Sequence, residues 1–192
     1  MLDQFVQYLI NLDLFYFYFF NIQLRNSLLD FLMPIITYGG AQITWLIFCG
    51  LLYLWGDQKA KRTAFVILVA LVIGYFFSEA IKLLIARPRP GDILNIGFFM
   101  EETGYSFPSG HSIASFSAFS ILGIKYGYIY IFIFLALMVA ISRIYLGVHY
   151  PSDVLVGSAL GIIFALIVLR MEGKLISLKN KVLNQYLKQF FK

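Results

Sequence analysis

Residues Thr63–Ser78, TAFVILVALVIGYFFS, contain no acidic or basic side chain. A helix that crosses a bilayer needs roughly 20 largely apolar residues, or roughly 17 when flanking side chains reach the interface. Four further stretches also lack Asp, Glu, Lys and Arg: Phe31–Gly56, Thr103–Ile124, Tyr126–Ser142 and Val154–Leu169. The sequence therefore predicts five membrane-spanning helices, of which the shorter ones need help from their flanks.

The composition agrees with a membrane protein. Of 192 residues, 60% are hydrophobic and only 13% are charged, whereas a soluble domain has about 25% charged residues. Such an apolar chain excludes a soluble enzyme and a disordered chain, and its single cysteine excludes an internal disulfide. We therefore expect an all-α, polytopic integral membrane protein, with residues 1–192 forming one membrane-embedded domain.

The N-terminal segment Phe5–Gln23 has two interpretations. It is rich in aromatic residues, which are typical of membrane interfaces, but Asn11, Asp13 and Asn21 interrupt it. It is predicted to be either a sixth span or an interfacial helix, which gives about six helices in total.

The first long apolar stretch, Phe31–Gly56, is interrupted by Pro34 and by two adjacent glycines. Proline and glycine both disfavour a continuous helix. We expect its spanning part to be Gln42–Trp55, extended backward by a turn, with Ser27–Tyr38 lying at the interface or re-entering.

Basic residues predict the orientation. Three connections, Asp57–Arg62, the turn at Lys125 and the tail after Leu169, hold ten of the 15 Lys and Arg residues, and such clusters mark cytoplasmic loops. This topology accounts for the net charge of +5 without nucleic acid. Loops Arg87–Ser106 and Ile144–Ser152 then face the periplasm or exterior, and an N-terminal span would place both termini in the cytoplasm. The basic tail, residues 171–192, is predicted to lie on the cytoplasmic leaflet as an amphipathic helix.

Ionisable residues gather at the opposite helix ends. They are Lys82, Arg89, His111, Arg143, His149 and Asp153. Ionisable groups near a bilayer are costly and usually functional. Each alone has an ordinary explanation; Lys82, for example, can pair with Glu79 one turn earlier. Together, with both histidines of the chain on one side, they predict an active site at the periplasmic or extracellular membrane face.

The cations and one helix start suit an anion. Lys82, Arg89 and Arg143 would supply three positive charges, and the planar fork of arginine matches phosphate oxygens. Ser109 is a natural N-cap for the next helix. Gly110 lets a ligand approach the backbone N–H groups that bind anions at a helix start. These features predict a phosphate cradle.

His149 and Asp153 suit nucleophilic catalysis. Pro151 is well placed as the first residue of the last helix, which puts Asp153 in its first turn. The Asp153 carboxylate can hold one ring nitrogen of His149 and leave the other free to attack, while His111 can protonate a leaving oxygen. A metal site is the rival interpretation, but the three nearby cations would repel Mg²⁺ or Zn²⁺. We therefore predict no metal and no cofactor.

These residues resemble the type 2 phosphatidic acid phosphatases, within the wider acid phosphatase and vanadium haloperoxidase superfamily. The family pattern is Lys-x6-Arg-Pro, then Pro-Ser-Gly-His, then Ser-Arg-x5-His-x3-Asp. The chain has Lys82 to Arg89-Pro90, Pro108-Ser109-Gly110-His111, and Ser142-Arg143 with His149 and Asp153. The match covers a motif-bearing core of residues 82–153. Its spacing selects Arg89 and leaves Arg87 unassigned.

The resemblance implies a metal-independent lipid phosphate phosphatase that works through a phosphohistidine. His149 would attack phosphorus, Asp153 would fix its tautomer, and His111 would protonate the leaving group before water releases phosphate. The phosphoryl oxygens would be held by Lys82, Arg89, Arg143 and the Ser109 and Gly110 amides. The haloperoxidase relatives are soluble, which the composition of this chain argues against.

The implied substrates are lipids of a bacterial cytoplasmic (inner) membrane: phosphatidylglycerol phosphate, undecaprenyl pyrophosphate, lipid A 1-phosphate or phosphatidic acid. We hypothesise that Arg87 contacts a second phosphate or a sugar. Two alternatives stay open: a lipid phosphotransferase with the same site, and a non-enzymatic lipid transporter, although the latter would need polar residues at the midplane. Substrate discrimination is expected in Asn11–Arg25 and in Gly91–Phe107, with Asp92, Glu101 and Glu102.

Overall fold

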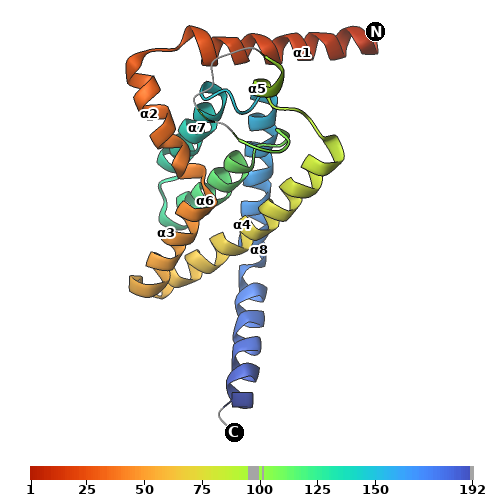
Figure 1. The fold of residues 1–192 in the computed structure, drawn as a ribbon. Coiled ribbons are helices and arrows are strands. Elements are labelled where there is room, and N and C mark those ends of the chain that lie inside the picture. Colours follow the sequence, from red (N-terminus) through yellow and green to blue (C-terminus); the bar gives the residue numbers. More distant parts are fainter. Residues whose placement is uncertain (95–99, 101, 191–192) are drawn as a thin grey trace.

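The computed structural model describes residues 1–94, 100 and 102–190. Every regular element in that part of the chain is a helix (Figure 1), as predicted. The elements are α1 (Leu2–Tyr18), the π-helix η1 (Phe19–Gln23), α2 (Ser27–Thr37), the 3-10 helix η2 (Tyr38–Gly40), α3 (Gln42–Trp55), α4 (Gln58–Ile85), α5 (Pro90–Ile93), α6 (Gly110–Tyr126), α7 (Ile129–Tyr145) and α8 (Pro151–Phe190).

Two segments of the described chain are individually long and apolar enough to cross a membrane. They are Gln58–Ile93, which contains α4, and Pro151–Tyr186 of α8. Helices α2 and α3, with η2, qualify together as one broken span or re-entrant pair bent by 59°. The predicted break and the bounds of α3 are confirmed, whereas α6 and α7 have only 17 residues each, about the shortest length that spans.

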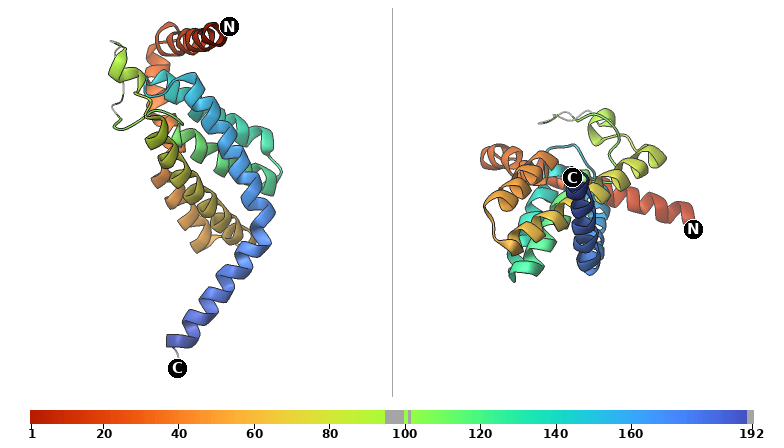
Figure 2. Two further views of the ribbon diagram at one scale, coloured as in Figure 1. Left: turned by 90° about the vertical axis from the view of Figure 1, so that its right-hand side faces the viewer. Right: turned by 90° about the horizontal axis from the view of Figure 1, so that it is seen from below.

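Helix α1 lies across one end of the bundle instead of running beside its helices (Figures 1 and 2). Polar contacts hold it there: Asn21 Nδ2 donates to the Tyr145 carbonyl at 2.7 Å, and the Ser152 N–H donates to Asp13 Oδ1 at 2.8 Å. This arrangement matches the interfacial alternative for the N-terminal segment. The N-terminus consequently lies at the opposite end of the molecule from the C-terminus.

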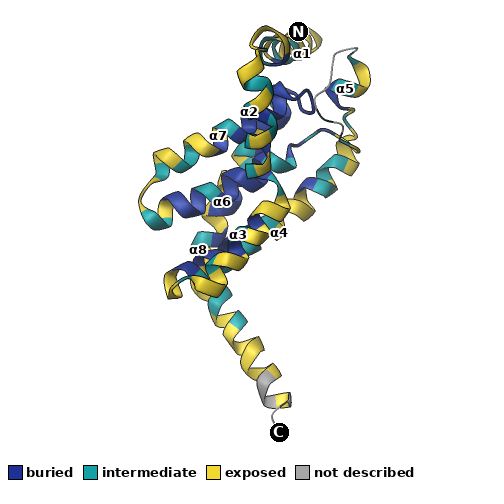
Figure 3. Ribbon diagram, turned by 60° about the vertical axis from the view of Figure 1, so that its left-hand side comes forward, coloured by how far each residue is buried: buried dark blue, intermediate teal, exposed yellow. Residues whose placement is uncertain are grey.

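Helix α6 forms the centre of the bundle and packs against α4, α7 and α8. Most of its length is buried (Figure 3). A Cβ added to Gly161 of α8 would lie 2.7 Å from the Ile113 carbonyl oxygen, and one on Gly157 would lie 2.7 Å from the Ser109 carbonyl oxygen. These glycines therefore let α8 approach α6 closely, at the level of the predicted site.

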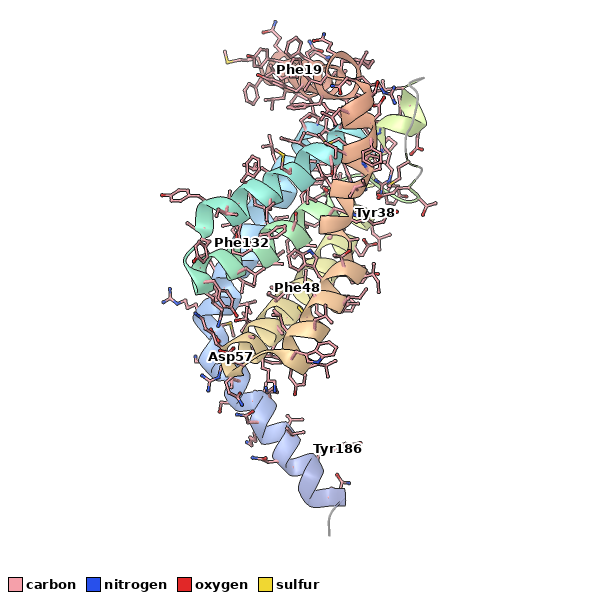
Figure 4. All side chains as sticks on the ribbon, turned by 90° about the vertical axis from the view of Figure 1, so that its left-hand side faces the viewer. Phe19, Tyr38, Phe48, Asp57, Phe132 and Tyr186 are labelled. Atoms are coloured by element: carbon pink, nitrogen blue, oxygen red, sulfur yellow. The ribbon has the colours of Figure 1, made fainter. Side chains whose placement is uncertain are left out.

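The basic connections meet at the end away from α1. Lys59 Nζ lies 4.6 Å from the centroid of the Tyr126 ring, and Lys125 pairs with Glu172 at 2.6 Å. In Figure 4, Asp57 and Tyr186 lie toward this end and Phe19 at the other. The predicted grouping of these connections is confirmed.

The basic tail does not form a separate helix lying across the bundle. Residues 171–190 continue α8 as one helix of 40 residues that projects beyond the other helices (Figure 2). No proline interrupts this part of the sequence, and Gly173 alone does not break the helix. The tail is therefore helical, and its placement on the cytoplasmic leaflet stays a prediction.

Candidate active site

Three helix ends build the site at the α1 end of the bundle. Helix α4 ends at Ala86, whose φ of 50° is left-handed, so the chain turns there toward Arg89. Ser109 caps α6, because its side chain accepts from the Ser112 N–H at 3.3 Å. Helix α8 begins at Pro151. Both predicted helix starts are therefore present.

A cavity of about 280 Å³ opens between these ends. Its wall also includes Leu71, Tyr75 and Ile113, so the cavity continues from the charged end along α4 and α6. Five of the eight predicted site residues line it, namely Lys82, Arg89, Gly110, His111 and His149.

The His149 ring lies between Asp153 and Arg89. Its Nδ1 lies 3.5 Å from Asp153 Oδ2 without forming a hydrogen bond, while its Nε2 lies 3.4 Å from Arg89 Nη1. The Tyr150 N–H donates to Asp153 Oδ2 at 2.9 Å and fixes that oxygen. Burial lowers the pKa of His149 well below its ordinary value, and the positive charges of Arg143 and Arg89 lower it further. The ring is therefore neutral, as a nucleophile must be.

Arg89 is held rigidly at the cavity wall. Its side chain is 6% exposed and donates to three backbone carbonyls, those of Gly104 at 3.0 Å, Val148 at 2.9 Å and Thr103 at 3.3 Å. Its Nη1 also lies 3.1 Å from Glu102 Oε2. A guanidinium fixed in this way can bind phosphoryl oxygens without first being ordered.

Glu102 bridges two of the arginines that are predicted to bind phosphate. Its carboxylate contacts Arg89 and also pairs with Arg143 Nη2. Arg143 is fully buried, donates to Thr37 Oγ1 at 2.7 Å and reaches the cavity only through Glu102. Burial opposes ionisation of Glu102, but the charge and hydrogen bond of Arg143 outweigh it and lower its pKa to about 2. The protein's own carboxylate therefore neutralises two predicted phosphate ligands.

The remaining predicted groups have partners in the free protein. Lys82 Nζ binds Glu79 at 2.7 Å, as the ordinary explanation expected, yet Lys82 still lines the cavity. The Ser109 N–H donates to the Asp153 carbonyl at 3.1 Å. Of the two backbone amides predicted to hold phosphoryl oxygens, that of Ser109 is therefore already in use. A Cβ on Gly110 would have Ser78 Oγ at 3.8 Å as its nearest atom, so the backbone there is open to a ligand.

Arg87 does not line the cavity. It donates to Asp153 Oδ1 at 2.6 Å and to Asp13 Oδ2 at 2.7 Å. The hypothesis that it contacts a second phosphate or a sugar finds no support here, because Nη1 and Nη2 are bound to Asp153, Ser152 and Asp13.

Sequence reasoning placed Asp13 and Glu102 only in segments expected to discriminate substrates, and gave neither a role in the catalytic centre. The sequence signal for Asp13 is a charged residue inside an aromatic segment, and the signal for Glu102 is an acidic residue in the loop before Pro108. Glu101, named with Glu102 for substrate discrimination, lies outside the described residues. Within the described ranges, no group of three or more His, Cys, Asp or Glu residues is placed to hold a metal ion.

Known proteins resemble this chain over most of its length. The model of the PAP2 superfamily matches residues 63–177, which include all three motifs. The chain is 29% identical to the undecaprenyl-diphosphatase of Sulfolobus acidocaldarius over 155 residues, 79% of this chain and 73% of that one. It is 32% identical to the bacitracin transport permease protein BcrC of Bacillus licheniformis over 162 residues, 81% and 78% of the two chains. The crystal structure of LpxE from Aquifex aeolicus superposes with a TM-score of 0.69 at 28% identity, covering 83% of this chain and 95% of that one.

Proposed function

The chain belongs to the PAP2 superfamily, and we propose that it is a membrane phosphatase that removes the terminal phosphate of a lipid phosphate or diphosphate through a phosphohistidine. One observation carries the proposal. A buried, neutral histidine has Nδ1 toward a carboxylate and Nε2 toward a cavity lined by Lys82 and Arg89. This is the arrangement that an in-line attack on phosphorus requires.

The two half-reactions follow from the two histidines. His149 Nε2 attacks phosphorus, so an N–P bond forms as the bond from phosphorus to the leaving oxygen breaks. His111, in its protonated form, gives that oxygen its proton and becomes neutral. Water then attacks the phosphohistidine and gives a proton to His111, and the N–P bond breaks to release phosphate. Asp153 stabilises the positive charge that His149 acquires, while Lys82, Arg89 and Arg143 stabilise the phosphoryl oxygens.

The shape of the cavity favours a lipid. Its polar end holds the cations, and its other end meets Leu71, Tyr75 and Ile113 on helices that face apolar surroundings. Phosphatidylglycerol phosphate, undecaprenyl pyrophosphate, lipid A 1-phosphate and phosphatidic acid all present a phosphate next to an apolar body. The Sulfolobus relative is named for undecaprenyl diphosphate, which makes that substrate the first to test.

The basic residues support one orientation. The end of the bundle with Lys59 and Lys125 is opposite the cavity, and basic ends face the cytoplasm. We therefore propose that the site faces the periplasm or exterior of a bacterial cytoplasmic membrane. The single domain over residues 1–192 stays a prediction.

Phosphate release by the purified protein in mixed micelles tests the function. The panel holds the four lipid phosphates, with His149→Ala as the inactive variant and Glu172→Gln, which breaks an ion pair at the other end of the bundle, as the matched control. We expect release by the wild type and the control, inhibition by vanadate, no effect of EDTA, and no turnover by His149→Ala. Near-normal activity of His149→Ala would refute the mechanism.

The same assay separates the alternatives. Transfer of the phosphate to an added acceptor lipid, with no free phosphate released when the acceptor is absent, would indicate a phosphotransferase. A protein that moves labelled lipid between the leaflets of a vesicle without releasing phosphate would be the transporter, a possibility raised by the name of the Bacillus licheniformis relative.

A further inference from the structure

Asp153 divides its two oxygens between different partners. Oδ2 accepts from the Tyr150 N–H and lies near His149 Nδ1, whereas Oδ1 accepts from Arg87 Nη1. The carboxylate is fully buried, so its charge needs a partner. Arg87 supplies it, and by holding Oδ1 it also fixes the rotation of the carboxylate that aims Oδ2 at His149.

Arg87 is itself held from three directions. Its Nη1 also donates to Ser152 Oγ at 2.7 Å, and Nη2 donates to Asp13 Oδ2 at 2.7 Å. Its guanidinium carbon lies 3.9 Å from the centroid of the Tyr150 ring, a cation–π contact. The carboxylates of Asp153 and Asp13, at 2.6 and 2.7 Å, compensate the positive charge of this half-buried guanidinium.

Asp13 brings α1 into this arrangement. Its Oδ1 accepts from the Ser152 N–H and its Oδ2 from the Ser152 hydroxyl at 2.6 Å, so it caps the first turn of α8 beside Asp153. One turn along α1, Phe17 is fully buried, with its ring centroid 5.7 Å from that of Tyr150. The helix across the end of the bundle is therefore attached next to the group that orients the nucleophile.

We propose that Asp13 and Arg87 are positioning residues: Asp13 on α1 holds Arg87, and Arg87 holds Asp153 in the rotation that orients His149. Attachment of α1 then sets the catalytic rate without contact with substrate. The inference rests on the proposed function for its effect on turnover.

Kinetics of Arg87→Ala, Arg87→Lys and Asp13→Asn test the proposal, with Glu172→Gln as control. In Arg87→Ala we expect kcat to fall about 10- to 100-fold, the range for outer partners that orient the groups of a site. Inhibition by vanadate should not change, because the cations of the cavity remain. Lysine should restore part of the rate, since it keeps the charge but not the fork. In an Asp153→Asn background, Arg87→Ala should have little further effect, because both changes remove one interaction.

Unchanged kcat in Arg87→Ala would overturn the inference, and so would a parallel loss of vanadate inhibition, which would place Arg87 in the anion site. If Arg87→Ala does not fold, the kinetics of Asp13→Asn test the proposal in its place. Its amide oxygen can still accept from the Ser152 N–H, so a lower kcat with unchanged vanadate inhibition supports the proposal and an unchanged kcat refutes it.

A readout without turnover separates this inference from the proposed function. The chain has two histidines, so ¹⁵N spectra of the ring nitrogens, assigned with His111→Asn, report His149 alone. We expect the Nδ1–H tautomer in the wild type and mixed tautomers in Arg87→Ala. An unchanged tautomer in Arg87→Ala refutes the inference. A wild type that hydrolyses no lipid of the panel refutes the proposed function instead, whatever the spectra show.

Discussion

Replacing Glu102 by glutamine should make the site bind oxyanions more tightly. In the free protein the Glu102 carboxylate lies on Arg89 and Arg143, two of the residues proposed to hold the phosphoryl group. A substrate or vanadate must displace this carboxylate before it can use both guanidinium groups. Glutamine keeps the size of the side chain but removes the charge, so it competes less strongly for the same donors.

The magnitude follows from the two contacts. Hydrogen bonds to charged groups contribute about 1.5–3 kcal/mol. The contacts of glutamine with the two guanidinium groups stay in this class, but loss of the carboxylate charge moves each from the upper toward the lower end of the range. The substitution therefore removes about 1 kcal/mol from each contact, or about 2 kcal/mol in total. The Glu102 side chain is 23% exposed, and water screens part of this difference. Since about 1.4 kcal/mol corresponds to a tenfold change, vanadate should bind Glu102→Gln about 10- to 30-fold more tightly.

Vanadate inhibition of phosphate release, measured for the wild type, Glu102→Gln and the control Glu172→Gln, gives the ratio directly. The pKa of Glu102 is lowered to about 2, so the carboxylate stays ionised at every pH above about 4. The ratio between wild type and variant should therefore be the same from pH 5 to pH 8. Equal or weaker inhibition of Glu102→Gln would show that the carboxylate does not compete with the anion, and the reasoning would fail.

Two further predictions concern pH and packing. Because the pKa of His149 lies well below its ordinary value, the nucleophile stays neutral as the pH falls through 6.5. We therefore expect kcat/KM to show no loss attributable to His149 between pH 8 and pH 6. A titration of the rate near pH 6.5 that persists in His111 variants would contradict this. Gly161→Ala should lower the free energy of unfolding by about 1–3 kcal/mol through overpacking, because its Cβ would lie 2.7 Å from the Ile113 carbonyl oxygen. Gly173→Ala is the control, since its Cβ would have no atom within 4 Å and should not lower stability. Thermal melts in one detergent compare the two variants, and equal melting temperatures would refute the close approach of α8 to α6.

Local sequence signals predicted the helices and the chemistry at their ends. Gln42–Trp55 was predicted as the helix after the glycine break, and α3 has these bounds. Ser109 and Pro151 were recognised as helix starts because capping depends on neighbours within one turn. The spacing of the motifs predicted Lys82, Arg89, His111 and His149 as site residues, and the fold places all four at one cavity. Each of these features is decided by residues close in sequence or by a motif of fixed spacing.

The errors concern partners that are distant in sequence. Arg87 binds residues 66 and 74 positions away, and Glu102 binds Arg143, 41 positions away. No periodicity or cap signals such pairs, so Arg87 was predicted to contact substrate, and Glu102 was named only for substrate discrimination. The Ser109 amide was misjudged for the same reason, since its acceptor is the carbonyl of Asp153 on another helix.

The position of α1 and the arrangement of the active site therefore depend on each other. A spanning α1 would run along the bundle and carry Asp13 away from the first turn of α8, leaving the buried pair of Arg87 and Asp153 without its third member. An α1 lying across the bundle end keeps Asp13 on Ser152 and Arg87. Asp13 and Asn21, two of the polar residues that made the N-terminal segment a poor span, are thus the ones that attach α1 to the end of the bundle. If Asp13 positions Arg87 as proposed, the attachment of α1 can be measured as a change in kcat.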